Sequence, residues 1–220
     1  MARRTTPAPP KLRALRLPEL SPGDPDRIRP HGTCEAVSFT GDDLTGTDLS
    51  DVGLTDCSLA ALNTHELELT GTRLTGSHLH HLDIPTVSAA YALVRGTVLE
   101  DSRLGVLQCI EGTWDSVHLR SAKIGYLSLR GASVQDVQFT GCVVEELDLT
   151  GASVQRVAFD DCEVGALDVS GAALADVDLR ALDLPEITGL GHLRGATIDQ
   201  VQLHLLAPAM AAQLGIAVED

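Results

Sequence analysis

The stretch EELDLTGASV, from Glu145 to Val154, is nearly repeated at intervals of twenty residues. The chain reads GYLSLRGASV twenty residues earlier, from Gly125 to Val134, and GALDVSGAAL twenty residues later, from Gly165 to Leu174. A near-copy at a fixed period of this length is typical of a stacked repeat architecture.

A shorter period of five residues underlies the repeat of twenty. Taking every fifth residue from Phe39 to Leu184 gives thirty positions, which we name the central residues. They are Leu, Ile, Val or Phe at every position except Thr64, Ala89, Cys109 and Trp114. A helix repeats its faces every 3.6 residues and a strand every two, so neither element explains a period of five.

A second apolar position, which we name the inner residue, lies two residues before each central residue. Successive inner residues are Leu127, Ala132, Val137 and Cys142, and the next twenty residues give the same set. Residues two apart in an extended segment share a face, so each group of five points two side chains inward and one outward. The last two residues form a corner, where Gly is frequent because the backbone turns sharply. Four corners close one coil of twenty residues, and near-identical coils stack.

This pattern resembles that of the pentapeptide-repeat family, Ala-Asp/Asn-Leu-X-X. The groups 147–151 (LDLTG) and 47–51 (TDLSD) match it closely, and the resemblance covers roughly residues 35–205. It implies the family's all-β fold, a right-handed quadrilateral parallel β-helix. The chain departs from the pattern by placing Leu, Val or Cys at many inner positions. Because this departure follows the twenty-residue rhythm, it indicates packing specific to each face.

Composition divides the chain into three expected segments. Residues 1–30 hold seven of the ten prolines and a net charge of +4, which predicts a basic tail, flexible or draped on the body. Residues 31–204 are expected to form the β-helix, of which the thirty groups would make seven and a half coils, roughly 36 Å long at about 4.8 Å per rung. Residues 205–220 are expected to form a short C-terminal helix and cap.

The expected β-helix changes phase near its C-terminal end. After Leu184, the residues Leu193, Ile198 and Leu203 continue the five-residue period one position out of phase, which predicts a bulge or small loop after Pro185.

The C-terminal segment then takes a helical period. Leu205, Leu206, Met210 and Leu214 fit a short helix with Pro208 near its start. We expect it to cover the open end of the coils, or alternatively to form a homodimer interface, as some members of the resembled family do at this end.

Charge and composition exclude several classes of function. The formal net charge is −15, which disfavours direct binding to nucleic acid or membrane and favours a protein partner with a basic surface. No apolar run follows Arg3 and Arg4, so a secretion signal is not expected. Polar residues and Pro208 interrupt the uncharged stretch 201–218, so a membrane-spanning helix is not expected either. Five cysteines without paired spacing indicate free thiols in a cytoplasmic protein.

Two clusters offer the residue types of a binding site, and we interpret both as structural. His78 and His80, followed by His81, offer two metal ligands on one side of a strand, but no third ligand is evident, so a solvated corner is favoured. Cys142 and Cys162 should be neighbours in the stack and are expected to stay reduced. No nucleophile elbow, phosphate loop or metal-spaced set occurs, so we expect no enzyme activity, no cofactor and no metal.

The acidic residues concentrate on two adjacent faces of the expected rod. Face A is the one with central residues Leu44, Ile84 and Val144, and face B is the next one, with Leu49, Leu129 and Leu149. The outward and corner acids of face A are Asp43, Glu66, Asp83, Glu145, Glu146, Glu163, Asp183 and Glu186. Those of face B are Asp48, Asp51, Glu68, Glu111, Asp148 and Asp168. Against Arg103, Lys123 and Arg130, the two faces carry −11 and the other two faces −4, which predicts an acidic, partner-binding side.

These features predict an acidic protein-interaction scaffold whose partner the sequence does not name. The resemblance implies an alternative, since the best-understood relatives confer fluoroquinolone resistance, resemble DNA and bind DNA gyrase. In that alternative the acidic side would enter a basic DNA-binding saddle and protect a topoisomerase from inhibitors. The tail complements the acidic side in charge, and we hypothesise that it folds over that side as a lid.

Overall fold

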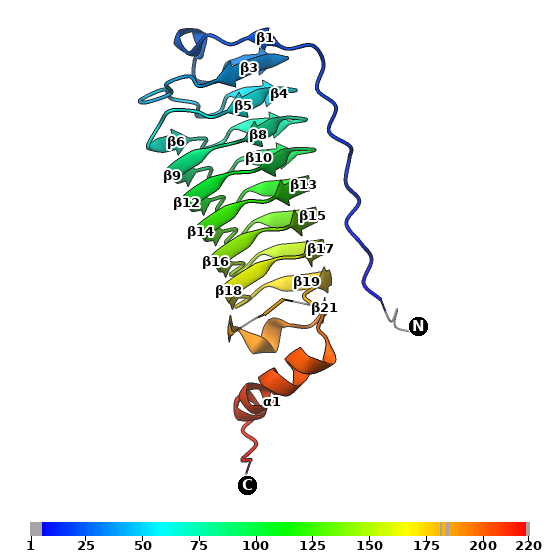
Figure 1. Ribbon diagram of the computed structural model, residues 1–220. Coiled ribbons are helices and arrows are strands. Elements are labelled where there is room, and N and C mark those ends of the chain that lie inside the picture. The colour runs from blue at the N-terminus through cyan, green and yellow to red at the C-terminus, as the bar shows by residue number, and fades with distance from the viewer. Residues whose placement is uncertain (1–5, 181, 184, 219–220) are drawn as a thin grey trace.

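The computed structural model describes residues 6–180, 182–183 and 185–218, and shows a rod made of stacked coils (Figure 1). It is a parallel β-solenoid of about nine turns with a short C-terminal helix, so the predicted fold class is confirmed. The turns outnumber the predicted seven and a half because short strands extend the stack at both ends. At about 4.8 Å per rung the rod is about 43 Å long. Central residue Leu184 and parts of the expected terminal segments, residues 1–5 and 219–220, lie outside the described residues.

Two parallel sheets form the walls of the rod over the described residues. One covers faces A and B and consists of β6 (Glu66–Glu68), β9 (Asp83–Ser88), β12 (Arg103–Gln108), β14 (Lys123–Ser128), β16 (Val143–Asp148), β18 (Glu163–Asp168) and β20 (Glu186–Thr188). The other covers the remaining faces, C and D. Its short strands are β1 (Ser21–Pro22), β2 (Thr33–Glu35), β3 (Val37–Thr40), β4 (Gly53–Thr55), β5 (Ser58–Ala60), β7 (Arg73–Thr75), β8 (His78–His80), β10 (Leu93–Arg95), β11 (Val98–Glu100) and β21 (Ala196–Thr197). Its long strands are β13 (Thr113–Arg120), β15 (Ser133–Thr140), β17 (Ser153–Asp160) and β19 (Ala173–Asp178).

The register of the sheets confirms the twenty-residue repeat. Val134 pairs with Trp114 on one side and with Val154 on the other, and Phe139 pairs with Phe159. The two phenyl rings stack with their centroids 4.7 Å apart. Each residue therefore lies directly over the one twenty positions earlier, because only this register keeps every inner and central side chain in the core.

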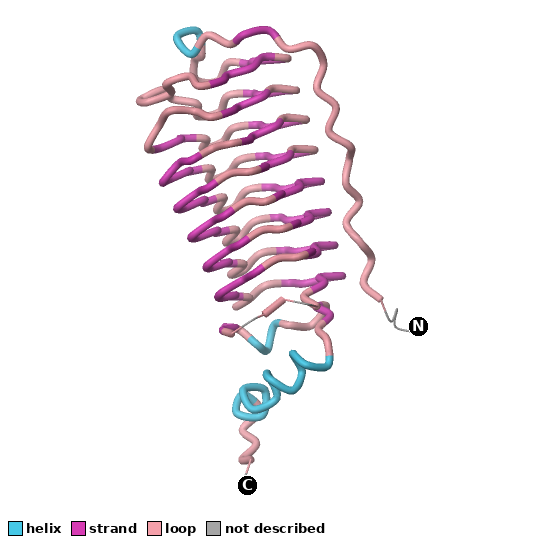
Figure 2. Tube along the Cα trace, in the orientation of Figure 1, coloured by secondary structure: helices cyan, strands magenta, loops and turns pink. Residues whose placement is uncertain are grey.

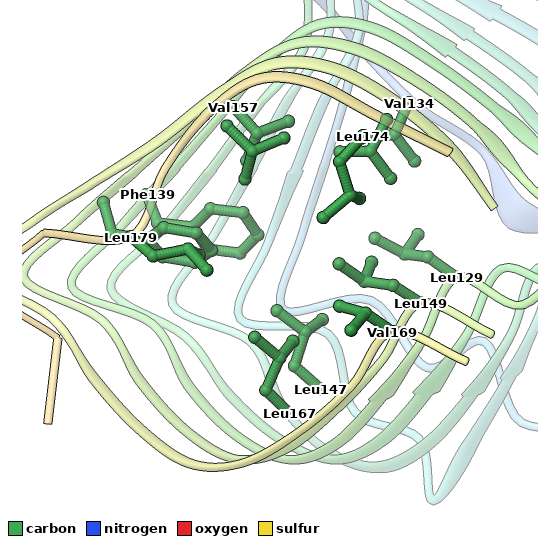
Figure 3. Close-up of a pocket in the computed structure, with 13 residues that line it drawn as sticks. Leu129, Val134, Phe139, Leu147, Leu149, Val157, Leu167, Val169, Leu174 and Leu179 are labelled. Atoms are coloured by element: carbon green, nitrogen blue, oxygen red, sulfur yellow. The ribbon is translucent and has the colours of Figure 1, made fainter. Parts of the chain in front are cut away.

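The interior of the rod is filled by the aliphatic side chains that the period predicts. Figure 3 shows Leu129, Leu149 and Val169 stacked over one another, each pointing into the core from its own coil, so that successive coils form successive layers. The space between these layers is a cavity of about 10 Å³, lined only by apolar side chains. Such a volume is too small to hold more than one water molecule, so this part of the rod has no room for an internal ligand.

In the C-terminal half of the rod, the corner between faces C and D is formed by residues other than glycine. Ser116, Asp136, Arg156 and Asp176 occupy equivalent positions in four successive coils and all have φ between 52° and 60°. Non-glycine residues rarely adopt this left-handed conformation. The stacked strands on either side hold them there, so the sequence preference for glycine at corners is not a requirement.

The predicted tail, residues 1–30, divides into two parts. Residues 6–20 run in extended form alongside the coils, opposite to the direction in which the coils stack (Figures 1 and 2). Residues 21–32 close the N-terminal end of the rod. There β1 pairs with β3, the short 3-10 helix η1 (Pro25–Arg27) follows, and Ile28 is buried against the core.

The hypothesis that the tail covers the acidic side is wrong. Residues 6–20 follow the corner between faces C and D, as the hydrogen bonds of Ala8 to Asp176 and Lys11 to Asp136 show. This corner is diagonally opposite the corner between faces A and B. The backbone N–H groups of the tail find fixed acceptors there, and this directional bonding decides the path in place of long-range charge attraction.

The predicted phase change at the C-terminal end is confirmed in part. Val177 pairs with Ala196, nineteen residues later, after the 3-10 helix η2 (Leu190–His192). Leu193 and Ile198 pack against the core as expected. Leu203 instead lies in the C-terminal helix and is 42% exposed, because the coils have already ended.

The C-terminal helix α1 (Gln200–Gln213) follows the last coil and packs against its open end through its two buried residues, Gln202 and Leu206. It begins at Gln200 and not at residue 205, because Asp199 and Gln202 form a capping box that starts it earlier. Pro208 consequently lies inside the helix instead of near its start. The buried side-chain amide of Gln202 donates hydrogen bonds to the carbonyls of Leu179 and Leu182, both at 2.7 Å. Within the described ranges, no helix is long and apolar enough to cross a membrane.

Candidate functional site

Face B uses its outward carboxylates to close the corners of the coils. Asp48, Glu68, Asp148 and Asp168 each accept a hydrogen bond from the backbone N–H two residues later, at 2.8–2.9 Å. A carboxylate of this kind satisfies a donor that the turning backbone leaves without a strand partner. These four predicted partner-binding acids therefore have a structural use in the fold.

Among the acids that the sequence places on the surface, Asp148 is the one whose position in the structure differs most from the prediction. Its residue surface is only 2% exposed, whereas the sequence pattern places it on the surface. The Tyr126 hydroxyl and the Arg130 guanidinium, both from the preceding coil, donate to it at 3.0 Å. Burial alone would raise the pKa of this carboxyl, but the hydrogen bonds from Thr150, Tyr126 and Arg130 together hold the pKa below its usual value.

A group of exposed carboxylates lies on face A near the C-terminal end of the rod. The group consists of five residues and is named the acidic patch: Glu145, Glu146, Glu163, Asp183 and Glu186. All five are exposed, and their carboxylates make no hydrogen bond or ion pair within the described residues. The strand register places Glu146 and Glu186 in one column, each next to Ala166, so they are two rungs or about 9.6 Å apart.

The N-terminal half of the same two faces has a different charge arrangement. Asp83 pairs in register with Arg103, which is followed by Lys123, so a basic column interrupts face A. Asp43 accepts from the backbone of Thr45. The other predicted acids of this half are Asp51, whose carboxylate lies 3.5 Å from the imidazole of His31, and the exposed Glu66 and Glu111. The predicted acidic side is thus uneven, and its unpartnered charge is densest in the acidic patch.

The histidine cluster lies on face D and is more buried than a solvated corner. The imidazole of His78 contacts the Glu100 carboxylate at 3.1 Å, and that of His80 contacts the Ser58 hydroxyl at 3.1 Å. The rings of His78 and His80 stack at 4.3 Å, while His81 is exposed. Burial and the neighbouring His78 lower the pKa of His80. No set of three metal-binding side chains occurs in the part of the chain that the structure describes.

Cys142 and Cys162 are neighbours in the stack, as predicted, and both thiols are free. The backbone N–H of Cys142 donates to the Cys162 sulfur at 3.3 Å. The neighbouring thiol of Cys142 is the largest cause that lowers the pKa of Cys162. Cys162 is half-buried, whereas Cys142 is fully enclosed, so Cys162 is the more reactive thiol of the two.

The structure also brings together residues that the sequence pattern did not single out. Gln202 is the buried amide that binds the carbonyls of the last coil, and its only sequence signal is the capping box with Asp199. Arg156 pairs with Asp136 at 2.5 Å, and both side chains are largely buried. A spacing of twenty between an acid and a base at a corner is the signal that indicates this pair.

Known protein families and structures were compared with this chain. No family model matches the sequence, and no curated protein matches it. Among solved structures, the chain is similar to a trypsin-treated form of QnrB1, a plasmid-mediated fluoroquinolone resistance protein. That likeness has 14% identity, covers 86% of this chain and 99% of that chain, and has a TM-score of 0.39.

A second similar structure is HetL, a pentapeptide-repeat protein involved in heterocyst differentiation regulation in the cyanobacterium Nostoc sp. strain PCC 7120. It has 18% identity, 79% coverage of this chain, 92% coverage of that chain and a TM-score of 0.35. At these values the fold assignment rests on the register of this chain itself. The five-residue groups and their twenty-residue register sustain the resemblance to pentapeptide-repeat proteins that the sequence indicates.

Proposed function

We propose that this chain is a non-enzymatic scaffold that binds a protein with a basic surface through the acidic patch. The observation that supports it is the contrast between the two faces. Four of the six acids of face B accept hydrogen bonds from the corners of the coils, whereas Glu145, Glu146 and Glu163 are exposed and have no partner within the described residues. Selection for solubility alone gives no reason for free carboxylates to gather on neighbouring rungs of one face.

The rigid coil spacing suits recognition of a basic surface. Carboxylates fixed on rungs that are about 4.8 Å apart present a charge pattern that needs little reordering on binding. Residues 31–220 carry a net charge of −19, so long-range attraction guides the encounter. The association is expected to weaken as salt rises, because exposed charges are screened.

DNA gyrase is the alternative partner, and size and charge favour it. The rod is about 43 Å long, and a duplex of that length carries about 25 charges at one per 1.7 Å. The net charge of residues 31–220 approaches that value. The basic column of Arg103 and Lys123 interrupts the match, so the mimicry would involve mainly the acidic patch.

The test compares two variants with the same change in net charge. The patch variant carries Glu145→Gln, Glu146→Gln and Glu163→Gln. The control variant carries Glu19→Gln, Asp26→Asn and Glu35→Gln, which are exposed acids away from the patch. Asp148 is kept in both, since changing it would disturb the fold.

Each variant is used to capture partners from cell extract at low and at high salt. Proteins bound by the wild type and the control variant, and lost with the patch variant, support the proposal. Equal capture by all three contradicts it. In parallel, gyrase supercoiling is measured with and without a fluoroquinolone. Inhibition or drug protection that the patch variant loses identifies gyrase as the partner, and no effect of the wild type excludes gyrase.

We also propose that α1 carries a self-association surface. Val201, Leu205 and Leu214 are each at least 68% exposed, although they are large and apolar. A second copy of the chain would cover them. Light scattering after size exclusion tests this. A wild-type dimer that becomes monomeric with Val201→Glu and Leu205→Glu supports the proposal, and a wild-type monomer contradicts it.

A further inference from the structure

The N-terminal segment 6–20, which we name the strap, is held to the body by its backbone. The N–H groups of Ala8 and Lys11 donate to the carboxylates of Asp176 and Asp136, at 3.0 and 2.9 Å. The N–H of Arg13 donates to the hydroxyl of Ser116 at 2.6 Å. The acceptors belong to one column of corner residues between faces C and D. We name this column the ladder; it consists of Ser116, Asp136, Arg156 and Asp176.

Between Ala8 and Lys11, the spacing of donors along the strap matches the spacing of acceptors along the ladder. Ala8 and Lys11 are three residues apart, about 9.3 Å in a polyproline II segment. Their acceptors are forty residues and therefore two coils apart, about 9.6 Å. Pro7, Pro9 and Pro10 hold this part of the strap extended and have no N–H that would be left unpaired. The second interval is a looser match, since Lys11 and Arg13 are about 6.2 Å apart in such a segment and their acceptors are one rung or about 4.8 Å apart.

The ladder does not depend on the strap to keep its shape. The guanidinium of Arg156 binds Asp136 through two nitrogens, at 2.5 and 2.8 Å, and holds the pKa of that carboxyl below its usual range. The acceptors stand on backbone whose positive φ is fixed by the strands on both sides. A site that keeps its geometry without its ligand loses little free energy in ordering when it binds one.

The strap, in contrast, is weakly attached. Its residues 6–20 make three hydrogen bonds to the body within the described residues, and the side chains of Lys11, Leu12 and Arg13 are exposed. A segment held by three hydrogen bonds and by half-buried side chains such as Pro10 and Leu15 opens more easily than the paired strands of the coils. The body recognises it mainly as an extended chain with N–H groups at the correct intervals, next to two carboxylates that favour basic residues.

We propose that the ladder is a peptide-binding site, and that the strap is its tethered ligand. The occupant from outside would be a proline-rich, basic segment of a partner protein, which binds in extended form and displaces the strap. The backbone hydrogen bonds supply affinity, and prolines between the donors supply the extended conformation. This site lies diagonally opposite the corner between faces A and B, so the inference is independent of the function proposed for the acidic patch.

The test uses the full chain and a fluorescent peptide with the sequence of residues 6–17, TPAPPKLRALRL. The donor-free protein carries Ala8→Pro, Lys11→Pro and Arg13→Pro, which remove the three N–H donors of the strap and keep it extended. The control protein carries Leu12→Pro and Ala14→Pro, whose N–H groups make no hydrogen bond within the described residues, and Lys11→Gln and Arg13→Gln, which remove the same two positive charges as the donor-free protein. Tryptic cleavage after Arg16 reports whether the strap has detached, and circular dichroism reports whether the coils are intact.

Fluorescence anisotropy then measures peptide binding to each protein. We expect the donor-free protein to bind the peptide at least tenfold more tightly than the wild type or the control protein, because its own strap no longer competes. A peptide with the same three proline substitutions should bind at least tenfold more weakly than the unmodified peptide and than a peptide with the four substitutions of the control protein. Asp176→Asn in the donor-free protein should weaken binding of the unmodified peptide.

Three results would overturn the proposal. The first is an intact donor-free protein that does not bind the unmodified peptide. The second is equal binding of the unmodified and the donor-free peptide. The third is a strap that stays protected from trypsin without its three donors, since backbone recognition would then not be what holds it.

Discussion

The middle of the rod and its two ends are stabilised differently. Between residues 113 and 178 the strands are six to eight residues long and every pair keeps a register of twenty. At the N-terminal end β1 has two residues, and at the C-terminal end β21 has two and pairs at a spacing of nineteen. In the middle each coil is covered by a near-copy of itself. The ends have no copy above or below, so residues outside the repeat cover them.

The covering residues differ in chemistry because the exposed groups differ. At the N-terminal end the core is open, and the apolar side chain of Ile28 together with the close approach of Gly23 to the Phe39 ring covers it. At the C-terminal end, carbonyls of the last coil lack strand partners, and the amide of Gln202 binds two of them. A further copy of the repeat therefore lengthens the rod but does not close its end, since the last edge always presents unpaired backbone groups.

The largest effect is expected from a cavity in the middle. Phe139→Ala should lower the free energy of unfolding by about 3–5 kcal/mol, because it removes a buried ring that stacks on Phe159. Urea denaturation measures this, with the exposed Gln155→Ala as a control that should leave stability unchanged. A loss below about 1 kcal/mol would show that the coils adjust independently and that the middle is not closely packed.

A smaller effect is expected at the N-terminal end. A Cβ atom at position 23 would lie 2.3 Å from Cε1 of Phe39, so Gly23→Ala should cost about 2 kcal/mol by overpacking. The double variant with Phe39→Leu tests the cause. It should lose less stability than the sum of the single changes, because the smaller side chain makes room. If the losses in the free energy of unfolding are additive, a direct contact between residue 23 and the Phe39 ring is contradicted.

At the C-terminal end, Gln202→Ala removes the side-chain donor of the Leu179 and Leu182 carbonyls, and the Leu179 carbonyl keeps only the N–H of Leu182, at 3.3 Å. We expect a loss of about 1–2 kcal/mol. Hydrogen exchange should speed up in β19 and β21 and stay unchanged in β13. Gln213→Ala, at the far end of α1, is the matched control. Faster exchange along the whole rod would mean that the ends and the middle unfold as one unit.

The smallest effect on stability is expected at a coil corner in the middle of the rod, and it depends on pH. Asp148→Asn should cost about 1 kcal/mol at pH 7, because the amide loses the charge-assisted bond from Arg130. The pKa of Asp148 is lowered in the folded state, so its contribution is present above the unfolded value of about 3.9 and is lost as the pH falls through the folded value.

Stability curves from pH 7 to pH 2 check this prediction. The wild type and the Asp148→Asn variant should converge in acid. The exposed Glu145→Gln should match the wild type at every pH. A difference between Asp148→Asn and the wild type that persists at pH 2 would contradict the role of the charge.

The residues that could be predicted from the sequence are those whose position follows from the period. The inner and central positions, the stacking of Cys142 over Cys162 and the phase change before Ile198 all follow from counting in fives. The burial of Asp148 does not, because it depends on Tyr126 and Arg130 of the neighbouring coil. The period identifies Asp148 and Glu145 alike as surface acids, and only contacts between coils separate the buried one from the exposed one.

The sequence by itself determined the solenoid, because a five-residue apolar period has few other ways to bury its side chains. It also determined the excess of acid on two faces, since register follows from the same count. The tertiary structure decided which acids are free, how the ends are covered and where the strap lies. These depend on hydrogen bonds between groups far apart in the chain, such as Ala8 and Asp176, and such bonds leave no periodic trace in the sequence.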